Sequence, residues 1–512
     1  MLPRFSLPPV EPGSAFNLAT KPKQVDAWLT RLPYANPLEA AAELTDYLAT
    51  CARLRLSPDT LEEILDCVMP TAGNLVVALK EKFHSESLPL PPNRQQAAEL
   101  CSRLMLEVGH VCKLIILSRS GKRFQLFGAK SVERHAYILM LALKEVVEVS
   151  LDTHQSPPAG IWKDIHQAYN FALINGWARS LPPGFSEGPS LENVYKYALL
   201  LDLADPYRIP REELFATKDI VLKFCGLVDL LAASDANLHG SVFAIDQESD
   251  SPAIVLSREA GADSSRWQRL LNTTQLVKRL SLLASQYARD NKPGSSRLDG
   301  AGADLAYLEL LHRLKAQWGG SVRRLGNRHP RYEATRFEVV FGLQSVHKRL
   351  EIPEAGLATS PFEVDAVPTT CLLVNDSVGG LALSRERPVS FQLHIGELAA
   401  VRQDRAERWS IGIVRWFRAT RTGKAIFGLQ YLAPSAAAVR LQREGDGAPL
   451  PALWLPATPS LRQGEMVLCQ GGKLAVGANV TLLGESFVER RIRLEQLAEF
   501  TPAIEAYRYR TL

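Results

Sequence analysis

The chain has 512 residues, of which 46% are hydrophobic and 22% are charged, and its formal net charge is +4. This length predicts about three domains, because a single hydrophobic core rarely serves more than about 250–300 residues. The composition is that of a folded globular protein and excludes wholesale disorder. A charge so close to balance does not indicate a DNA-binding protein, so any anion site must come from a local cluster of basic residues.

The cysteines and the N-terminus indicate the cellular compartment in which the protein is expected. Seven cysteines are scattered along the chain without a C-x-x-C pair, and no His/Cys group has metal-ligand spacing. We therefore expect buried free thiols in a reducing compartment and no metal site. The proline-rich N-terminus lacks the apolar core of a signal peptide, and no apolar run is long enough to cross a bilayer. These features predict a cytoplasmic protein without membrane insertion.

The first 320 residues show mainly helical periodicity. Residues 1–35 look like an irregular leader, and Ser57-Pro58 followed by acidic residues is a typical helix start. Amphipathic stretches separated by short Gly, Pro and Ser breaks predict a helical bundle over 36–180. A second helical region is expected over 190–318, with helices at about 190–202, 211–234, 264–290 and 303–317.

One β feature interrupts the second helical region. Two short runs of β-forming residues flank the polar segment Gln247–Pro252, which predicts a β-hairpin at 240–257. The histidines of the first 320 residues are isolated from cysteine or acid partners, so we expect no catalytic site among them. The helices are instead a candidate protein-interaction module.

The composition changes at about residue 320. Beyond it, aromatic and β-branched residues alternate with polar ones in short runs, which predicts a β-barrel or sandwich over 321–445. A small β unit is expected over 446–512, with a short helix at Leu494–Phe500. The predicted fold class is therefore multidomain α+β: a helical region with a small inserted β-hairpin, then an antiparallel β-barrel and a small C-terminal β unit.

The stretch Thr370–Ser384 combines an apolar run with a polar corner that contains glycine. The short side chains of Asn375, Asp376 and Ser377 can bond their own backbone, and glycine tolerates backbone angles that other residues avoid. Such a corner can hold a small anionic or heterocyclic ligand. A plain β-hairpin turn is the alternative that fits the same residues.

Residues 321–331, the arginine segment, precede this corner and read S-V-R-R-L-G-N-R-H-P-R. Guanidinium groups bind phosphates with two parallel hydrogen bonds, read the O6/N7 edge of guanine and stack on purines. An arginine segment folded over a barrel face could therefore clamp a ligand with two phosphates and two guanines. Further along, Arg415 and Arg418 are expected on a solvated strand face, and Trp409 and Trp416 in barrel packing.

Residues 321 to about 442 resemble a PilZ domain, the bacterial receptor module for cyclic di-GMP. That family carries R-x-x-x-R before the barrel and [D/N]-x-S-x-x-G within it, and Asn375–Gly380 matches the second motif at every specified position. Arg324 and Arg328 satisfy the first motif, whereas in the register that ends at Arg331 its first arginine is replaced by Asn327. The resemblance implies a cyclic di-GMP site formed by Arg324, Arg328, Arg331, Asn375, Ser377 and Gly380.

The resemblance also implies a function. The chain would be a non-enzymatic receptor whose ligand is cyclic di-GMP, with no metal and no other cofactor. Nucleotide binding at the barrel would be coupled to a protein partner at the helical region, in the control of motility, pili or biofilm formation. The alternative is a degenerate PilZ scaffold that binds protein and no nucleotide.

Overall fold

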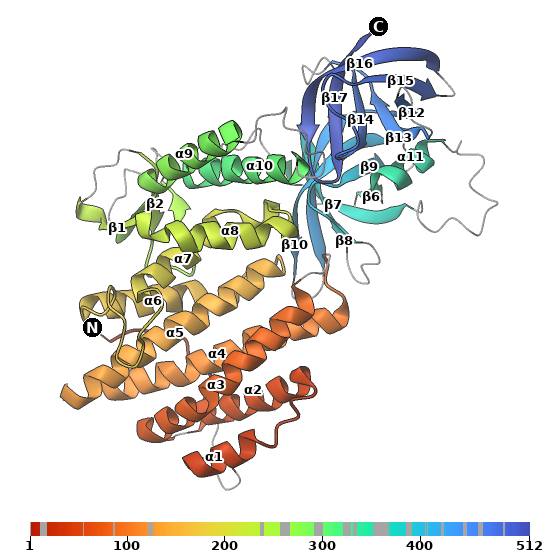
Figure 1. Ribbon diagram of the computed structural model, residues 1–512. Helices are drawn as coiled ribbons and strands as arrows, with labels where there is room; N and C mark the ends of the chain where they lie inside the picture. Colours follow the sequence, from red (N-terminus) through yellow and green to blue (C-terminus); the bar gives the residue numbers. More distant parts are fainter. Residues whose placement is uncertain are drawn as a thin grey trace. The chain divides into compact units, whose positions relative to one another are not determined.

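The structure is a computed structural model of the chain (Figure 1). It describes residues 2–10, 18–54, 56–84, 88–120, 126–235, 240–256, 267–290, 301–320, 329–330, 335–351, 368–385, 392–404, 406, 408–420, 424–443, 448–458, 464–484 and 487–512. Two compact units are present. The first comprises Met1–Pro206, Leu214–Leu282 and Arg313–Val322, and the second comprises Tyr207–Glu213, Leu283–His312 and Arg323–Leu512.

Helices dominate the N-terminal three fifths of the chain. Each of the first four begins at a proline, whose fixed φ suits the first helical position and whose missing N–H costs nothing there. The Ser57 hydroxyl caps the third helix by accepting from the Thr60 backbone N–H at 3.1 Å. The helices are α1 (Pro22–Leu29), α2 (Pro37–Arg53), α3 (Pro58–Phe83), α4 (Pro92–Ser120), α5 (Leu126–Asp152), α6 (Ile161–Ile174), α7 (Leu191–Leu203), α8 (Arg211–Phe224), α9 (Thr274–Asp290) and α10 (Ala301–Trp318).

The predicted irregular leader is only partly irregular. Its residues 2–10 contain no helix or strand, and they pack on the bundle: the Ser6 backbone N–H donates to Asp164 Oδ1 at 2.9 Å. The buried ammonium of Lys113 donates to Asp164 Oδ2 at 2.6 Å and to the Ser6 carbonyl at 3.1 Å. Helix α1, however, lies within the segment expected to be irregular.

The predicted β-hairpin is confirmed and belongs to a larger sheet. Strands β2 (Val242–Ile245) and β3 (Ile254–Val255) pair antiparallel, and β1 (Asp229–Ala232) and β4 (Arg269–Asn272) extend them in the order β1-β4-β2-β3. The helices predicted over 211–234 and 264–290 were therefore too long. Their overextended ends are short leucine-rich runs, and periodicity alone does not distinguish a buried strand from a helix in such runs.

The middle of the second unit is an antiparallel β-barrel. Its sheet order is β5-β7-β6-β9-β10-β11-β8, and pairing of β7 with β8 closes the ring. The fold class predicted from alternating strands is thus confirmed. The strands are β5 (His329–Pro330), β6 (Arg336–Phe341), β7 (Thr369–Ser377), β8 (Gly380–Arg385), β9 (Leu398–Gln403), β10 (Ser410–Ala419) and β11 (Ala425–Ala433).

A second closed barrel follows (Figure 1, blue). The helix predicted at Leu494–Phe500 is wrong: these residues continue β16, where pairing with β17 overrides their helix-forming composition. The strand β12 lies inside the range 321–445 but pairs with β13 and β15, so it is part of this barrel. The ring order is β12 (Ala437–Arg443), β13 (Leu450–Leu455), β14 (Met466–Gln470), β17 (Ile504–Thr511), β16 (Phe487–Phe500) and β15 (Asn479–Gly484).

One hydrophobic cluster joins the two barrels. Val346 of helix α11 (Leu343–Glu351) and Ile413 of β10 belong to it, together with Leu468 of the C-terminal barrel. Trp409 is buried in the same cluster, which agrees with its expected packing role. The outer face of β10 at Ile413 is therefore covered by the second barrel. Among the described residues, no helix combines the length and the apolar character needed to cross a membrane.

Candidate functional site

The Asn375–Gly380 corner is the tight connection between β7 and β8. Ser377 pairs directly with Gly380, and Val378 and Gly379 form the two-residue turn. The Ser377 hydroxyl donates to the Gly380 carbonyl at 3.1 Å, which fixes the turn from inside. A β-bulge follows Leu373, so that Asn375 faces Ala382 across the pair. The corner is thus a rigid hairpin whose polar side chains are partly exposed.

Gly380 is required by the barrel itself. A Cβ atom added there would lie 2.1 Å from the Leu429 carbonyl oxygen and 3.2 Å from the Gln430 Cα of β11. The absence of a side chain at Gly380 thus leaves room for the backbone of the adjacent strand. No local sequence signal reports this contact, because it depends on the register of β11.

We expect Gly380→Ala to destabilise the middle barrel by about 1–3 kcal/mol, because a backbone carbonyl cannot move aside as a flexible side chain would. Gly379→Ala is the matched control, since an added Cβ there meets no atom within 4 Å. Thermal unfolding of the two variants and of the wild type measures the difference. Equal midpoints for the two variants would contradict the packing explanation.

The described part of the arginine segment lies at the same corner. Strand β5 pairs antiparallel with the end of β7, so that His329 faces Asp376 and Pro330 faces Asn375. The predicted site residues Arg324, Arg328 and Arg331 lie outside the described residues. Of the six predicted site residues, the structure therefore places Asn375, Ser377 and Gly380 together.

Strand β11 borders the corner on its other side. The Tyr431 backbone N–H donates to the Gly379 carbonyl at 3.0 Å, and Gln430 is the direct partner of Gly380. Burial and the nearby Asp376 carboxylate raise the pKa of the Tyr431 hydroxyl to about 12, so it stays protonated at neutral pH. Sequence reasoning missed both residues, because it could not supply the register of β11 against β8.

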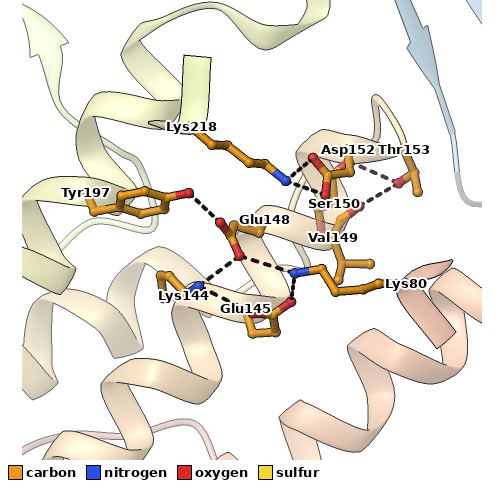
Figure 2. A network of polar contacts seen from close by, with 10 residues as sticks. All are labelled: Lys80, Lys144, Glu145, Glu148, Val149, Ser150, Asp152, Thr153, Tyr197 and Lys218. Carbon is orange, nitrogen blue, oxygen red and sulfur yellow. Dashed lines mark hydrogen bonds and ion pairs between the residues drawn. The ribbon is translucent and has the colours of Figure 1, made fainter. Parts of the chain in front are cut away.

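A second polar cluster lies in the helical unit (Figure 2). Glu148 accepts from Lys144 Nζ at 2.8 Å, from Lys80 Nζ at 3.5 Å and from the Tyr197 hydroxyl. Lys218 of α8 donates to Asp152 Oδ2 at 2.6 Å. Three ammonium groups and the carboxylates of Glu145, Glu148 and Asp152 thus balance one another between α3, α5, α7 and α8.

Each charge of this cluster already has a partner within it. Burial alone would raise the pKa of Glu148, but Lys144, Lys218 and Lys80 outweigh burial and hold the pKa well below its ordinary value. A carboxylate held ionised in this way does not act as a proton-transfer group near neutral pH. The charges of the cluster are therefore paired with one another, and in the described part of the chain no three His, Cys, Asp or Glu residues gather as a metal site.

Comparison with known proteins covers all three regions. Residues 23–235 match the family model of the N-terminal domain of the cyclic-di-GMP receptor FimW, residues 362–438 its middle PilZ domain, and residues 436–512 its C-terminal β-barrel domain. The cyclic-di-GMP receptor FimW of Pseudomonas aeruginosa is 25% identical over 98% of this chain and 92% of its own length. The border between the last two matches falls at the start of β12, where the second barrel begins. The three matches follow the FimW domain order along the chain, and the chain is therefore a PilZ-domain protein whose helical region and two barrels are each similar to the corresponding FimW domain.

Proposed function

We propose that this chain is a non-enzymatic receptor that binds cyclic di-GMP at the Asn375–Gly380 corner of its middle barrel. The observation that carries the proposal is the pairing of β5 with β7, because it places His329 and Pro330, the described residues of the arginine segment, beside Asp376 and Asn375 of the motif. Strand β5 consists of His329 and Pro330, and in the sequence an arginine stands directly before it and another directly after it. The FimW match supports the same ligand class.

Two of the predicted arginines are covalent neighbours of β5. Arg328 precedes His329 and Arg331 follows Pro330, and consecutive Cα atoms are about 3.8 Å apart. An arginine side chain attached at either position has the length to contact a ligand seated beside Asn375. Arg324 is one R-x-x-x-R interval before Arg328, and the proposal includes it as the first arginine of the motif.

The chemistry of this set suits a cyclic dinucleotide. Guanidinium groups bind phosphate oxygens and guanine acceptors, and both are hydrogen bonds of the stronger, charge-assisted kind. The Asn375 amide can donate and accept, and the Ser377 hydroxyl, which donates to Gly380, keeps its acceptor lone pairs. Since the whole chain carries little net charge, these local cations would provide the attraction for a dianion.

Asn375→Ala and Ser377→Ala are each expected to weaken cyclic di-GMP binding about tenfold, the cost of one hydrogen bond of roughly 1–1.5 kcal/mol. Isothermal titration calorimetry on the full chain measures the effect. Val378→Ala is the matched control, because Val378 lies in the same turn with 89% of its surface exposed and offers no polar group. Affinities that stay at the wild-type value in both polar variants would count against this corner as the binding site.

The proposal as a whole is tested by titrating the full-length wild type with cyclic di-GMP, with GMP as the control ligand. Saturable binding at micromolar concentrations, absent for GMP, is the expected result. A flat titration would refute the receptor and favour the alternative, a PilZ scaffold that binds protein only. The replacement of the first motif arginine by Asn327 in one register is the observation on which this alternative rests.

We further propose that the receptor is cytoplasmic, where its seven cysteines stay reduced, and that its helices bind a protein partner in the control of motility, pili or biofilm formation. The FimW N-terminal domain match, which spans α1 to α8, supports a defined role for the helices. Hydrogen exchange of the full chain with and without cyclic di-GMP tests the coupling. Ligand-dependent protection within α1–α8 is expected, and changes confined to the middle barrel would contradict it.

A further inference from the structure

We infer that Arg415 is a further ligand-binding residue of the proposed cyclic di-GMP site and that Glu499, from the C-terminal barrel, positions it. The inference rests on the proposed function. Arg415 was expected on a solvated strand face, but only 30% of its side chain is exposed. Its Nε donates to Gln430 Oε1 at 2.8 Å, and its Nη2 donates to Glu499 Oε2 at 2.7 Å.

Arg415 lies at the end of a row of residues that starts at the motif. Ser377 pairs with Gly380, and Gly380 pairs with Gln430, across β7, β8 and β11. Directly paired residues of antiparallel strands place their side chains on the same face, about 4.5–5.5 Å apart. Gly380 itself is buried, and the Arg415 guanidinium lies beyond Gln430, whose side-chain oxygen it contacts.

The guanidinium is fixed on one edge and available on the other. An arginine has five N–H donors, and two of those of Arg415 are used by Gln430 and Glu499. The remaining three, including both on Nη1, have no protein partner among the described residues. Because two hydrogen bonds already hold the side chain, little rotamer freedom is lost when a ligand binds.

The neighbouring carboxylate indicates which part of the ligand this edge contacts. A phosphate beside Arg415 would also approach Glu499 and be repelled by it. A guanine presents the two acceptors O6 and N7 without a formal charge, and arginine binds both at once. The geometry therefore assigns Arg415 to a guanine edge, which separates it from the phosphate-binding role open to the arginine segment.

The C-terminal barrel completes this part of the site. Glu499 follows a β-bulge in β16, and two residues later the Thr501 hydroxyl donates to the Gly396 carbonyl of the middle barrel at 2.7 Å. These contacts hold the end of β16 against the middle barrel. The second barrel would thus contribute to nucleotide binding, because its Glu499 positions Arg415 at one wall of the site.

The test is calorimetric titration of full-length variants with cyclic di-GMP and with cyclic di-AMP. Arg415→Ala is expected to weaken cyclic di-GMP binding about tenfold to hundredfold and to change cyclic di-AMP binding little, because adenine lacks the O6 acceptor. Arg415→Lys is expected to recover only a small part of the affinity that Arg415→Ala loses, since lysine cannot donate two parallel hydrogen bonds to guanine O6 and N7. Glu499→Ala should lower the affinity for cyclic di-GMP several-fold. The double variant should bind cyclic di-GMP no more weakly than Arg415→Ala does, because Glu499 acts through Arg415.

The matched control is the ion pair of Arg440 and Glu351, which also joins β12 of the second barrel to α11, at 3.2 Å. Glu351→Ala is expected to leave both affinities unchanged. The inference would be overturned if the losses of binding free energy caused by Arg415→Ala and Glu499→Ala added up in the double variant. It would also be overturned if Arg415→Ala kept the wild-type preference for cyclic di-GMP over cyclic di-AMP. In both cases, binding of cyclic di-GMP by the wild type would leave the proposed function unaffected. A wild type that binds no cyclic di-GMP would refute the proposed function itself.

Discussion

Replacing Arg328 and Arg331 together with alanine is expected to weaken cyclic di-GMP binding by roughly two to four orders of magnitude. Each charge-assisted hydrogen bond contributes about 1.5–3 kcal/mol, and two arginines supply at least two of them. Both arginines are covalent neighbours of β5, whose partners are Asn375 and Asp376. Calorimetry of the full chain measures the loss, and a thermal unfolding midpoint equal to that of the wild type shows that the barrel is intact.

The control for this variant is Arg440→Ala, which removes an arginine whose side chain is 56% exposed and lies in the second barrel. Its affinity should match that of the wild type. Single variants then decide the motif register. If Arg324 and Arg328 are the two arginines of R-x-x-x-R, Arg324→Ala should weaken cyclic di-GMP binding as much as Arg328→Ala does. If Asn327 and Arg331 occupy those two positions, Arg324→Ala should leave the affinity unchanged. A double variant that binds within threefold of the wild type would refute the arginine clamp.

Local sequence patterns were sufficient for much of the fold. Alternating apolar residues predicted the middle barrel, and the polar segment Gln247–Pro252 predicted the hairpin, because both signals arise within a few residues. The helix predicted at Leu494–Phe500 failed for the opposite reason: the residues favour a helix locally, and their long antiparallel pairing with β17 decides the outcome. Strands β1 and β4 were missed because their leucine-rich runs are too short to show a period.

The candidate site was half predictable. The short polar side chains and glycines of Asn375–Gly380 predict a tight turn from local composition alone, without knowledge of the neighbouring strands. The partners of Arg415 could not be read in the same way, because Glu499 is 84 positions away and belongs to another barrel. The ion cluster of the helical unit was missed for the same reason, since Lys80 and Glu148 are 68 positions apart and only the tertiary structure brings them together.

Glu148→Ala is expected to destabilise the helical unit by about 3–5 kcal/mol, the typical cost of removing one partner of a buried charge cluster. The substitution leaves the Tyr197 hydroxyl and Lys144 without their shared acceptor in Figure 2. Far-UV circular dichroism during denaturant unfolding follows the helices. The matched control is Glu495→Ala, which breaks the exposed ion pair with Arg510 and should cost less than about 1 kcal/mol.

The same variant predicts a pH dependence with a definite sign. Because the pKa of Glu148 is lower in the folded chain than in the unfolded chain, its contribution is fully present above the unfolded value of about 4.3 and declines as the pH falls below it. The difference in unfolding free energy between wild type and Glu148→Ala should therefore be constant near neutral pH and shrink in acid, while the Glu495→Ala difference stays small throughout. A Glu148→Ala difference that remained unchanged in acid would show that lost packing, and not the lost carboxylate, destabilises the variant.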